Sequence, residues 1–179
     1  ASDVNRIVVD FLSLAKPSDV EVKTVSLNYL IESMRYLMEG SSLLHNVKII
    51  IRLSEKEKNI KADPNQLKQV LLNMVQNAIE ASIAKEDARI CISTRLSDNE
   101  EEMQLIISDN GCGISKENLK HIGKNFFTTK ETGTGLGLSL CYRIVEQHGG
   151  RIGVKSRENV GTTFTLYFPT IKKEKYNCN

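Results

Sequence analysis

Residues 63–84, with the sequence DPNQLKQVLLNMVQNAIEASIA, contain the clearest helix signal in the chain. Asp63 is a favoured N-cap residue, Pro64 suits the first helical position, and Gln66 is placed to bond back to the cap as in a capping box. Apolar residues then recur at spacings of three and four, which predicts one buried face. These residues are Leu67, Val70, Leu71, Met74, Val75, Ala78 and Ile79. The stretch therefore predicts an amphipathic helix that runs to about Ala84.

Runs of β-forming residues follow this helix. Residues 89–96 and 103–108 flank a polar turn, which predicts an antiparallel hairpin. Residues 151–155 and 162–168 form a second strand pair. A fifth strand is predicted upstream of the helix, over residues 47–53.

Two further helices are predicted, one before the first of these strands and one between the two strand pairs. Ser26 can cap a helix that ends near Gly40, and residues 138–147 form the other before Gly149 and Gly150 stop it. The inner face of the first would consist of Leu27, Leu30, Ile31, Met34, Leu37 and Met38.

The mixed order of helices and hairpins predicts an α+β fold. We expect two layers, with a mixed sheet of about five strands and three main helices on one face. A doubly wound parallel sheet would instead need strands that alternate regularly with helices.

Composition excludes several classes of protein. The 179 residues suit one domain, and 24 Lys and Arg against 22 Asp and Glu give a net charge of +2, which lacks the basic footprint of a nucleic-acid binder. No apolar run approaches the ~18 residues of a membrane span. The four cysteines form no C-x-x-C pair, so we expect reduced cytosolic thiols, a cytoplasmic location and no membrane contact by this chain.

The two ends of the chain differ from its middle. Val4, Ile7, Val8, Phe11, Leu12 and Ala15 form an amphipathic helical stripe that Pro17 ends. This stripe fits either the truncated end of a helical bundle or a helix that docks on the domain. We therefore divide the chain into residues 1–17, a main domain over 18–170, and a disordered tail over 171–179.

Glycine-rich segments after residue 108 indicate phosphate chemistry, because glycine lets backbone N–H groups approach phosphate oxygens. The two common nucleotide motifs do not fit. A P-loop would need glycine at Asn118 and Ser or Thr at Asn125. A dinucleotide fingerprint at Gly133 to Gly137 would need glycine at Leu138 and a strand directly before it.

Four elements remain, in a fixed order along the chain. Asn73 and Asn77 lie four residues apart on the predicted helix, so both can face one ligand. The segment 109–113, DNGCG, ends a strand with a carboxylate beside a tight loop. Phe126 and Phe127 then precede the 133–137 glycine loop, which opens onto a helix N-terminus and so offers a phosphate site. The segment 161–164 starts the last strand.

This set resembles the GHKL ATPase superfamily and, within it, the catalytic domain of sensor histidine kinases. Residues 73–78 resemble the N box, 109–113 the first glycine box, Phe126 and Phe127 the F box, and 133–137 the second glycine box. The resemblance implies a two-layer sandwich of the Bergerat type that binds ATP. Residues 5–17 also resemble the end of the second helix of the kinase dimerisation domain, which accounts for the uncapped start.

The resemblance also implies roles for individual residues. Asp109 would accept a hydrogen bond from the adenine amino group, and Asn77, assisted by Asn73, would coordinate Mg²⁺. Lys130 is the lid cation that would reach the γ-phosphate. The remaining expected contacts to the nucleotide are Gly111, Gly113, Ile114, Phe127, Thr129, Gly133, Thr134, Gly135, Leu136, Gly137, Leu138 and Thr163.

The resemblance leaves three functions to distinguish. The first is a protein-histidine kinase whose γ-phosphoryl acceptor lies elsewhere, because none of His45, His121 and His148 has the sequence setting of a phosphoacceptor. Its partners would be the dimerisation domain of the same kinase and a response regulator, with the whole protein a homodimer and this chain a monomer. The second is an ATP-gated conformational machine, and the third is a non-catalytic nucleotide-binding module.

Overall fold

The structure is a computed structural model and describes residues 20–128 and 134–172. These residues form two short paired strands, the five strands of a larger sheet and four helices. They are β1 (Lys23–Val25), α2 (Leu27–Leu43), β2 (Lys48–Arg52), β3 (Ile60–Ala62), α3 (Pro64–Ser82), β4 (Arg89–Leu96), β5 (Glu102–Asp109), α4 (Lys116–Leu119), α5 (Gly137–Gln147), β6 (Arg151–Arg157) and β7 (Gly161–Pro169).

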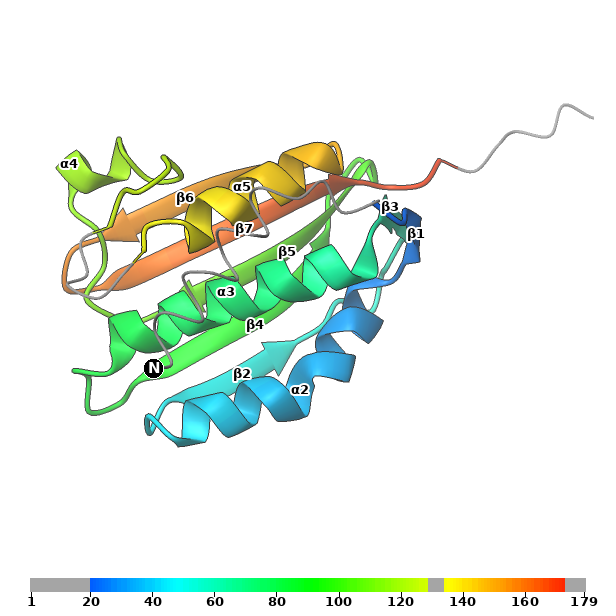
Figure 1. The fold of residues 1–179 in the computed structure, drawn as a ribbon. Coiled ribbons are helices and arrows are strands. Elements are labelled where there is room, and N and C mark those ends of the chain that lie inside the picture. Colours follow the sequence, from blue (N-terminus) through cyan, green and yellow to red (C-terminus); the bar gives the residue numbers. More distant parts are fainter. Residues whose placement is uncertain (1–19, 129–133, 173–179) are drawn as a thin grey trace, which may run out of the picture.

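Two layers make up the described part of the fold (Figure 1). Helices α2, α3 and α5 lie side by side across one face of a sheet with strand order β2-β4-β5-β7-β6. β2 pairs with β4 in parallel and every other pair in this sheet is antiparallel. The α+β class, the mixed five-stranded sheet and the three covering helices are therefore confirmed.

The core fills the space between these layers. Alternate residues of the central strands face the helices, such as Ile90 and Ile92 of β4 and Leu105 and Ile107 of β5. They pack against the apolar stripe of α3, in which all seven predicted residues are buried. On the opposite face of the sheet, Gly161 is the one buried strand residue in the described part of the chain, and it carries no side chain.

Two short strands were not predicted. β1 and β3 pair antiparallel, with Thr24 opposite Lys61, outside the main sheet. Each has three residues, too few for an alternating pattern to show in the sequence.

The prediction for α2 was partly wrong. Leu37 is 56% exposed rather than buried, because it lies at the edge of the stripe that faces the core. The helix also continues past Gly40 to Leu43, and the buried Ser42 extends its inner face. An added Cβ at Gly40 would meet nothing within 4 Å, so no packing constraint ends the helix there.

The capping box of α3 forms only in part. The Asp63 carboxylate accepts the N–H groups of Asn65 and Gln66, as expected of a cap. The backbone N–H of Asp63, which was expected to bond Gln66, donates instead to Nε2 of His148. A residue from the end of α5 thus replaces the local partner.

The two ends of the chain lie largely outside the described residues. The expected helix over residues 4–15 and most of the expected tail lie outside the described residues. Ile171, within that tail, donates its backbone N–H to the Asn59 carbonyl at 2.9 Å. None of the helices in residues 20–128 and 134–172 is long and apolar enough to span a membrane.

Candidate functional site

One face of α3 connects the two glycine-rich segments. Asn73, Asn77 and Ala81 follow one another at one-turn intervals. Nδ2 of Asn73 lies 3.5 Å from the Gly137 carbonyl oxygen, and the carbonyl of Ala81 accepts the backbone N–H of Cys112 at 2.9 Å. Asn77 therefore lies between the first glycine segment, at 109–113, and Gly137, the last residue of the second.

Asp109 ends β5 on the face that carries the helices, two residues after the buried Ile107. Its Oδ1 accepts the backbone N–H of Gly111 at 2.9 Å and that of Thr162 at 3.2 Å. Burial raises the pKa of this carboxyl above its ordinary value of 3.8, and the two N–H groups act in the opposite direction. The carboxylate is thus held in a fixed, partly buried position at the end of the sheet.

Two glycines allow the loop after Asp109 to pack closely. A Cβ at Gly111 would lie 2.4 Å from the Ala81 carbonyl oxygen, so a larger residue would push the loop away from α3. Gly113 has φ +69°, and a Cβ there would lie 2.1 Å from the Arg157 carbonyl oxygen. The loop is therefore clamped between the end of α3 and the end of β6.

The second glycine segment leads into α5 without a side-chain cap. Leu136 is the N-cap residue and is buried, and its N–H donates to Oγ1 of Thr134 at 3.3 Å. Gly135 accepts the N–H of Phe126 at 3.1 Å, which joins this segment to the F box. Leu138 in the first turn packs against the core. Because no side chain caps α5, its N-terminus can serve an anion.

The structure does not bring Thr163 to the site. Thr163 pairs with Ser108, and its hydroxyl lies 2.7 Å from the Ser108 hydroxyl on the sheet face away from the helices. Thr162 pairs with Asp109, is 4% exposed and faces the helices. Strand parity could have identified it, because Phe164, Leu166 and Phe168 set the buried face of β7 and residue 162 shares it.

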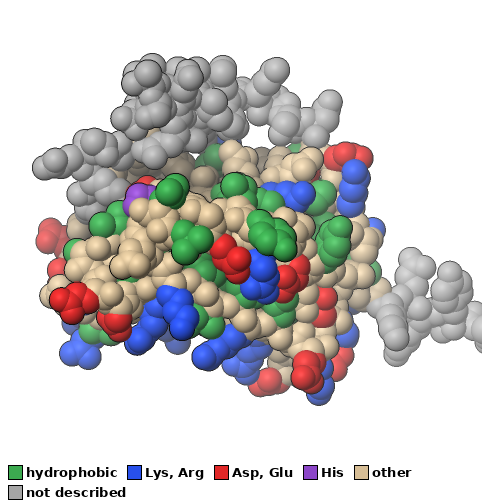
Figure 2. Space-filling model, turned by 90° about the horizontal axis from the view of Figure 1, so that it is seen from below, with side chains coloured by type: hydrophobic (Ala, Val, Ile, Leu, Met, Phe, Trp, Pro, Cys, Tyr) green, Lys and Arg blue, Asp and Glu red, His purple; other side chains and the backbone are tan. Residues whose placement is uncertain are grey.

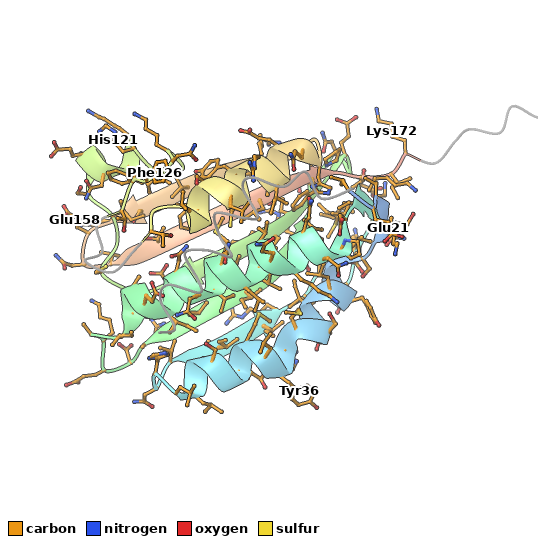
Figure 3. The ribbon with its side chains drawn as sticks, in the orientation of Figure 1. Glu21, Tyr36, His121, Phe126, Glu158 and Lys172 are labelled. Atoms are coloured by element: carbon orange, nitrogen blue, oxygen red, sulfur yellow. The ribbon has the colours of Figure 1, made fainter. Side chains whose placement is uncertain are left out.

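The segment between the glycine loops is described only up to residue 128. The ring of Phe127 lies 5.4 Å from that of His121, whereas Phe126 is 70% exposed and does not anchor the core. Ile114 packs against the core. His121, Phe126 and Glu158 lie at one end of the molecule, and Glu21 and Lys172 at the other (Figure 3). Three predicted site residues, Thr129, Lys130 and Gly133, lie outside the described residues.

The polar groups of the site favour oxygen ligation. Within the described ranges, no group of three or more His, Cys, Asp and Glu side chains could hold a metal ion. The side chains of α3 that face the space between the glycine segments are amides, which can supply neutral oxygen ligands. Bound phosphate groups would therefore have to supply the negative charge for any cation there.

Comparisons with known proteins agree with this arrangement. A family model described as "Histidine kinase-, DNA gyrase B-, and HSP90-like ATPase" matches residues 62–172. Sensor histidine kinase ZraS of Escherichia coli (strain K12) is 38% identical over 169 residues, which cover 94% of this chain and 36% of that protein. The chain thus spans little more than a third of this relative.

Solved structures give the same result. The nucleotide-free catalytic domain of histidine kinase ThkA has a TM-score of 0.73 and 35% identity, over 84% of this chain and 98% of that one. The crystal structure of ThkA in complex with the response regulator protein TrrA has a TM-score of 0.78 and 32% identity, over 95% of this chain and 48% of that one.

Proposed function

The chain belongs to the histidine kinase-, DNA gyrase B- and HSP90-like ATPase family, and from this premise we propose that it is the ATP-binding catalytic domain of a sensor histidine kinase. The observation that carries the proposal is the row of Asn73, Asn77 and Ala81, which joins the two glycine segments along one helix face. A nucleotide that lies along this row would have its base near Asp109 and its phosphates near the start of α5.

The base end suits adenine. The Asp109 carboxylate is an acceptor, and the exocyclic amino group of adenine is a donor, whereas guanine carries a carbonyl oxygen at that position. The glycines at 111 and 113 let the loop beside this carboxylate pack closely against the ends of α3 and β6. We therefore propose that Asp109 selects ATP over GTP.

The phosphate end of the candidate site suits a triphosphate. The uncapped N-terminus of α5 supplies backbone N–H groups and the positive end of the helix dipole. By resemblance to the family, Thr129, Lys130 and Gly133 complete this end, with Lys130 directed to the γ-phosphate.

Mg²⁺ fits the donor set. Asn77 and Asn73 present amide oxygens, and magnesium prefers oxygen ligands and keeps waters and phosphate oxygens in its shell. When bound, the ion would neutralise charge on the phosphates. The role of the chain's own residues is to hold the triphosphate extended and to keep its γ-phosphoryl group accessible to a second domain.

The proposed reaction is transfer to a histidine on the dimerisation domain of the same kinase. An imidazole nitrogen forms a bond to the γ-phosphorus, the bond from that phosphorus to the β–γ bridging oxygen breaks, and ADP leaves with the electron pair. The phosphorylated histidine would then serve a response regulator, a partner that the ThkA–TrrA complex supports by similarity. We propose a cytoplasmic location, a homodimeric whole protein and a monomeric isolated chain.

The alternative of an ATP-gated conformational machine makes a different prediction. By resemblance, such members carry a glutamate at the position of Asn73, and this glutamate acts on water. An amide is a very poor base, and general-base assistance contributes about 10²–10⁴-fold, so we expect slow hydrolysis here.

The test combines two measurements on one preparation. The chain is incubated with radioactive Mg·ATP, alone and with a matched dimerisation domain, and both hydrolysis and labelling are followed. The proposal expects slow hydrolysis, no labelling of the chain itself and labelling of the added domain. Fast hydrolysis without transfer would favour the conformational machine, and binding without either reaction would favour a non-catalytic module.

A further inference from the structure

Ser156 joins three segments at the base end of the candidate site. Its Oγ accepts the backbone N–H of Ile114 at 2.8 Å, where the first glycine loop leads into the segment before α4. The same hydroxyl lies 2.8 Å from Oγ1 of Thr162 and 3.0 Å from the carbonyl oxygen of Gly161. Ser156 pairs with Thr162 across β6 and β7, so the strand ladder fixes its position.

This hydroxyl is also linked to Asp109. The N–H of Thr162 donates to Oδ1 of Asp109 at 3.2 Å. A chain of hydrogen bonds therefore runs from Asp109 through Thr162 and Ser156 to the backbone of Ile114. The carboxylate defines one side of the base position, and the loop that ends at Ile114 defines another.

We propose that Ser156 is a positioning residue for nucleotide binding, whose hydroxyl holds the Ile114 backbone at a fixed distance from Asp109 and so sets the shape of the base pocket. The inference rests on the proposed function, because it presumes a base beside Asp109. Ser156 acts through Ile114 and Thr162 and need not touch the nucleotide.

Loss of the hydroxyl has a clear physical consequence. The N–H of Ile114 would lose its acceptor, and the loop from 111 to 114 would gain freedom that nucleotide binding must then remove. One lost hydrogen bond to an otherwise unpaired group costs enough to weaken binding about fivefold. A loss of folding stability alone would not weaken nucleotide binding in this way, because a variant that still folds would form the rest of the site.

The chain offers a matched control on the other face of the sheet. Ser108 precedes Asp109, and its hydroxyl lies 2.7 Å from that of Thr163, facing away from the helices. Ser108→Ala removes the Ser108 hydroxyl, and with it the contact to Thr163, at the same level of the sheet. It leaves the hydrogen bond between Ser156 and Ile114 in place. Ser156→Thr keeps the hydroxyl and serves as the rescue variant.

The experiment measures Mg·ATP binding by titration calorimetry and amide exchange at Ile114 by NMR in each variant. We expect Ser156→Ala to bind about fivefold more weakly and to exchange faster at Ile114, while Ser108→Ala and Ser156→Thr stay within about twofold of the unmodified chain. Equal affinity in folded Ser156→Ala, or an equal loss in Ser108→Ala, would overturn the inference. If the alanine variant does not fold, Ser156→Cys replaces it with the same expectation, because a thiol is a weak hydrogen-bonding group. Absence of Mg·ATP binding by the unmodified chain would overturn the proposed function instead.

Discussion

Nε2 of His148 accepts the backbone N–H of Asp63 at 2.9 Å, across 85 residues of sequence. Its Nδ1 lies 2.7 Å from the Ile144 carbonyl oxygen and so acts as the donor there, which fixes the neutral tautomer. The Asp63 carboxylate also accepts the N–H of Glu21, near the start of the described chain. His148 and Asp63 therefore join the start of α3, the end of α5 and the segment before β1 at the end of the molecule far from the candidate site.

Replacement of Asp63 should destabilise the fold in a pH-dependent way. Burial acts to raise the pKa of Asp63, but the N–H groups of Glu21, Asn65 and Gln66 lower it below its ordinary value of 3.8. For an acid whose folded pKa is depressed, the stabilisation is complete above the unfolded pKa and is lost as pH falls through the folded pKa. Asp63→Ala should thus cost about 1 kcal/mol at neutral pH and less in strong acid.

Urea unfolding at several pH values measures this free energy. Asp98→Ala is the control, because the Asp98 side chain is 97% exposed in the turn after β4. Its unfolding free energy should match that of the unmodified chain at every pH. A penalty for Asp63→Ala that stays constant down to acid pH would contradict the role of the ionised carboxylate.

Asp109 should control both the affinity for ATP and its pH dependence. A charge-assisted hydrogen bond is typically worth about 1.5–3 kcal/mol, so Asp109→Ala should weaken ATP binding at least about tenfold. The bond to adenine requires the ionised carboxylate, and burial raises the pKa of Asp109. The affinity should therefore begin to fall at a higher pH than an exposed aspartate would give.

Asp109→Asn separates this effect from protonation of the triphosphate. The amide does not titrate. The ratio of the ATP affinity of the unmodified chain to that of Asp109→Asn therefore isolates the protonation of Asp109. We expect the ratio, measured by calorimetry, to shrink as pH falls through the raised pKa. A ratio independent of pH would remove Asp109 from the base contact.

Thr162 and Thr163 provide a test of strand parity. Thr162→Val keeps the branched shape but removes the hydroxyl beside Ser156 on the helix face, and it should weaken nucleotide binding by a few fold, about 1 kcal/mol. Thr163→Val loses a hydroxyl contact on the far face and should leave binding unchanged. Calorimetric titration with ATP compares them, and the reverse order would restore Thr163 to the site.

Regular elements were the part of the fold that the sequence could predict. Asp63, Pro64 and the apolar stripe of α3 are local signals, and the strands after them show alternation over eight residues. The prediction failed where a partner comes from a distant segment. Gln66 was the plausible local bond for the Asp63 N–H, but only the folded chain brings His148 to it.

The sequence predicted which segments form the candidate site, but not every residue that those segments contribute. The glycines and asparagines are informative because few residue types can replace them at close backbone approaches, as at Gly111. Thr163 was chosen over Thr162 by resemblance, although the parity of β7 places Thr162 on the helix face. Ser156 was missed altogether, since a serine on an edge strand carries no signal until its contact with Ile114 is seen.

Outside the candidate site, one side of helix α2 is exposed to solvent. Figure 2 shows hydrophobic side chains scattered around a small group of acidic and basic ones on the face seen from below. On α2, Arg35 bonds both Glu32 and Glu39, and Tyr29 and Tyr36 are 76% and 88% exposed. Surface ion pairs of this kind contribute little to stability, so substitutions on this face are suitable neutral controls for the site variants.

Asn77 should account for the magnesium dependence of nucleotide binding. Its place on α3, one turn after Asn73 and one turn before Ala81, puts its amide between the two glycine segments. Asn77→Ala removes one oxygen ligand, so binding of ATP with Mg²⁺ should weaken more than binding of ATP in excess EDTA. Gln76→Ala is the matched control, because Gln76 bonds Glu80 and lies near Ser41 of α2, on another face of the same helix. Calorimetry with and without the metal gives both affinities for each variant. An equal loss for Asn77→Ala under the two conditions would assign Asn77 to the base or to the fold, and an equal effect of Gln76→Ala would show that α3 itself had been disturbed.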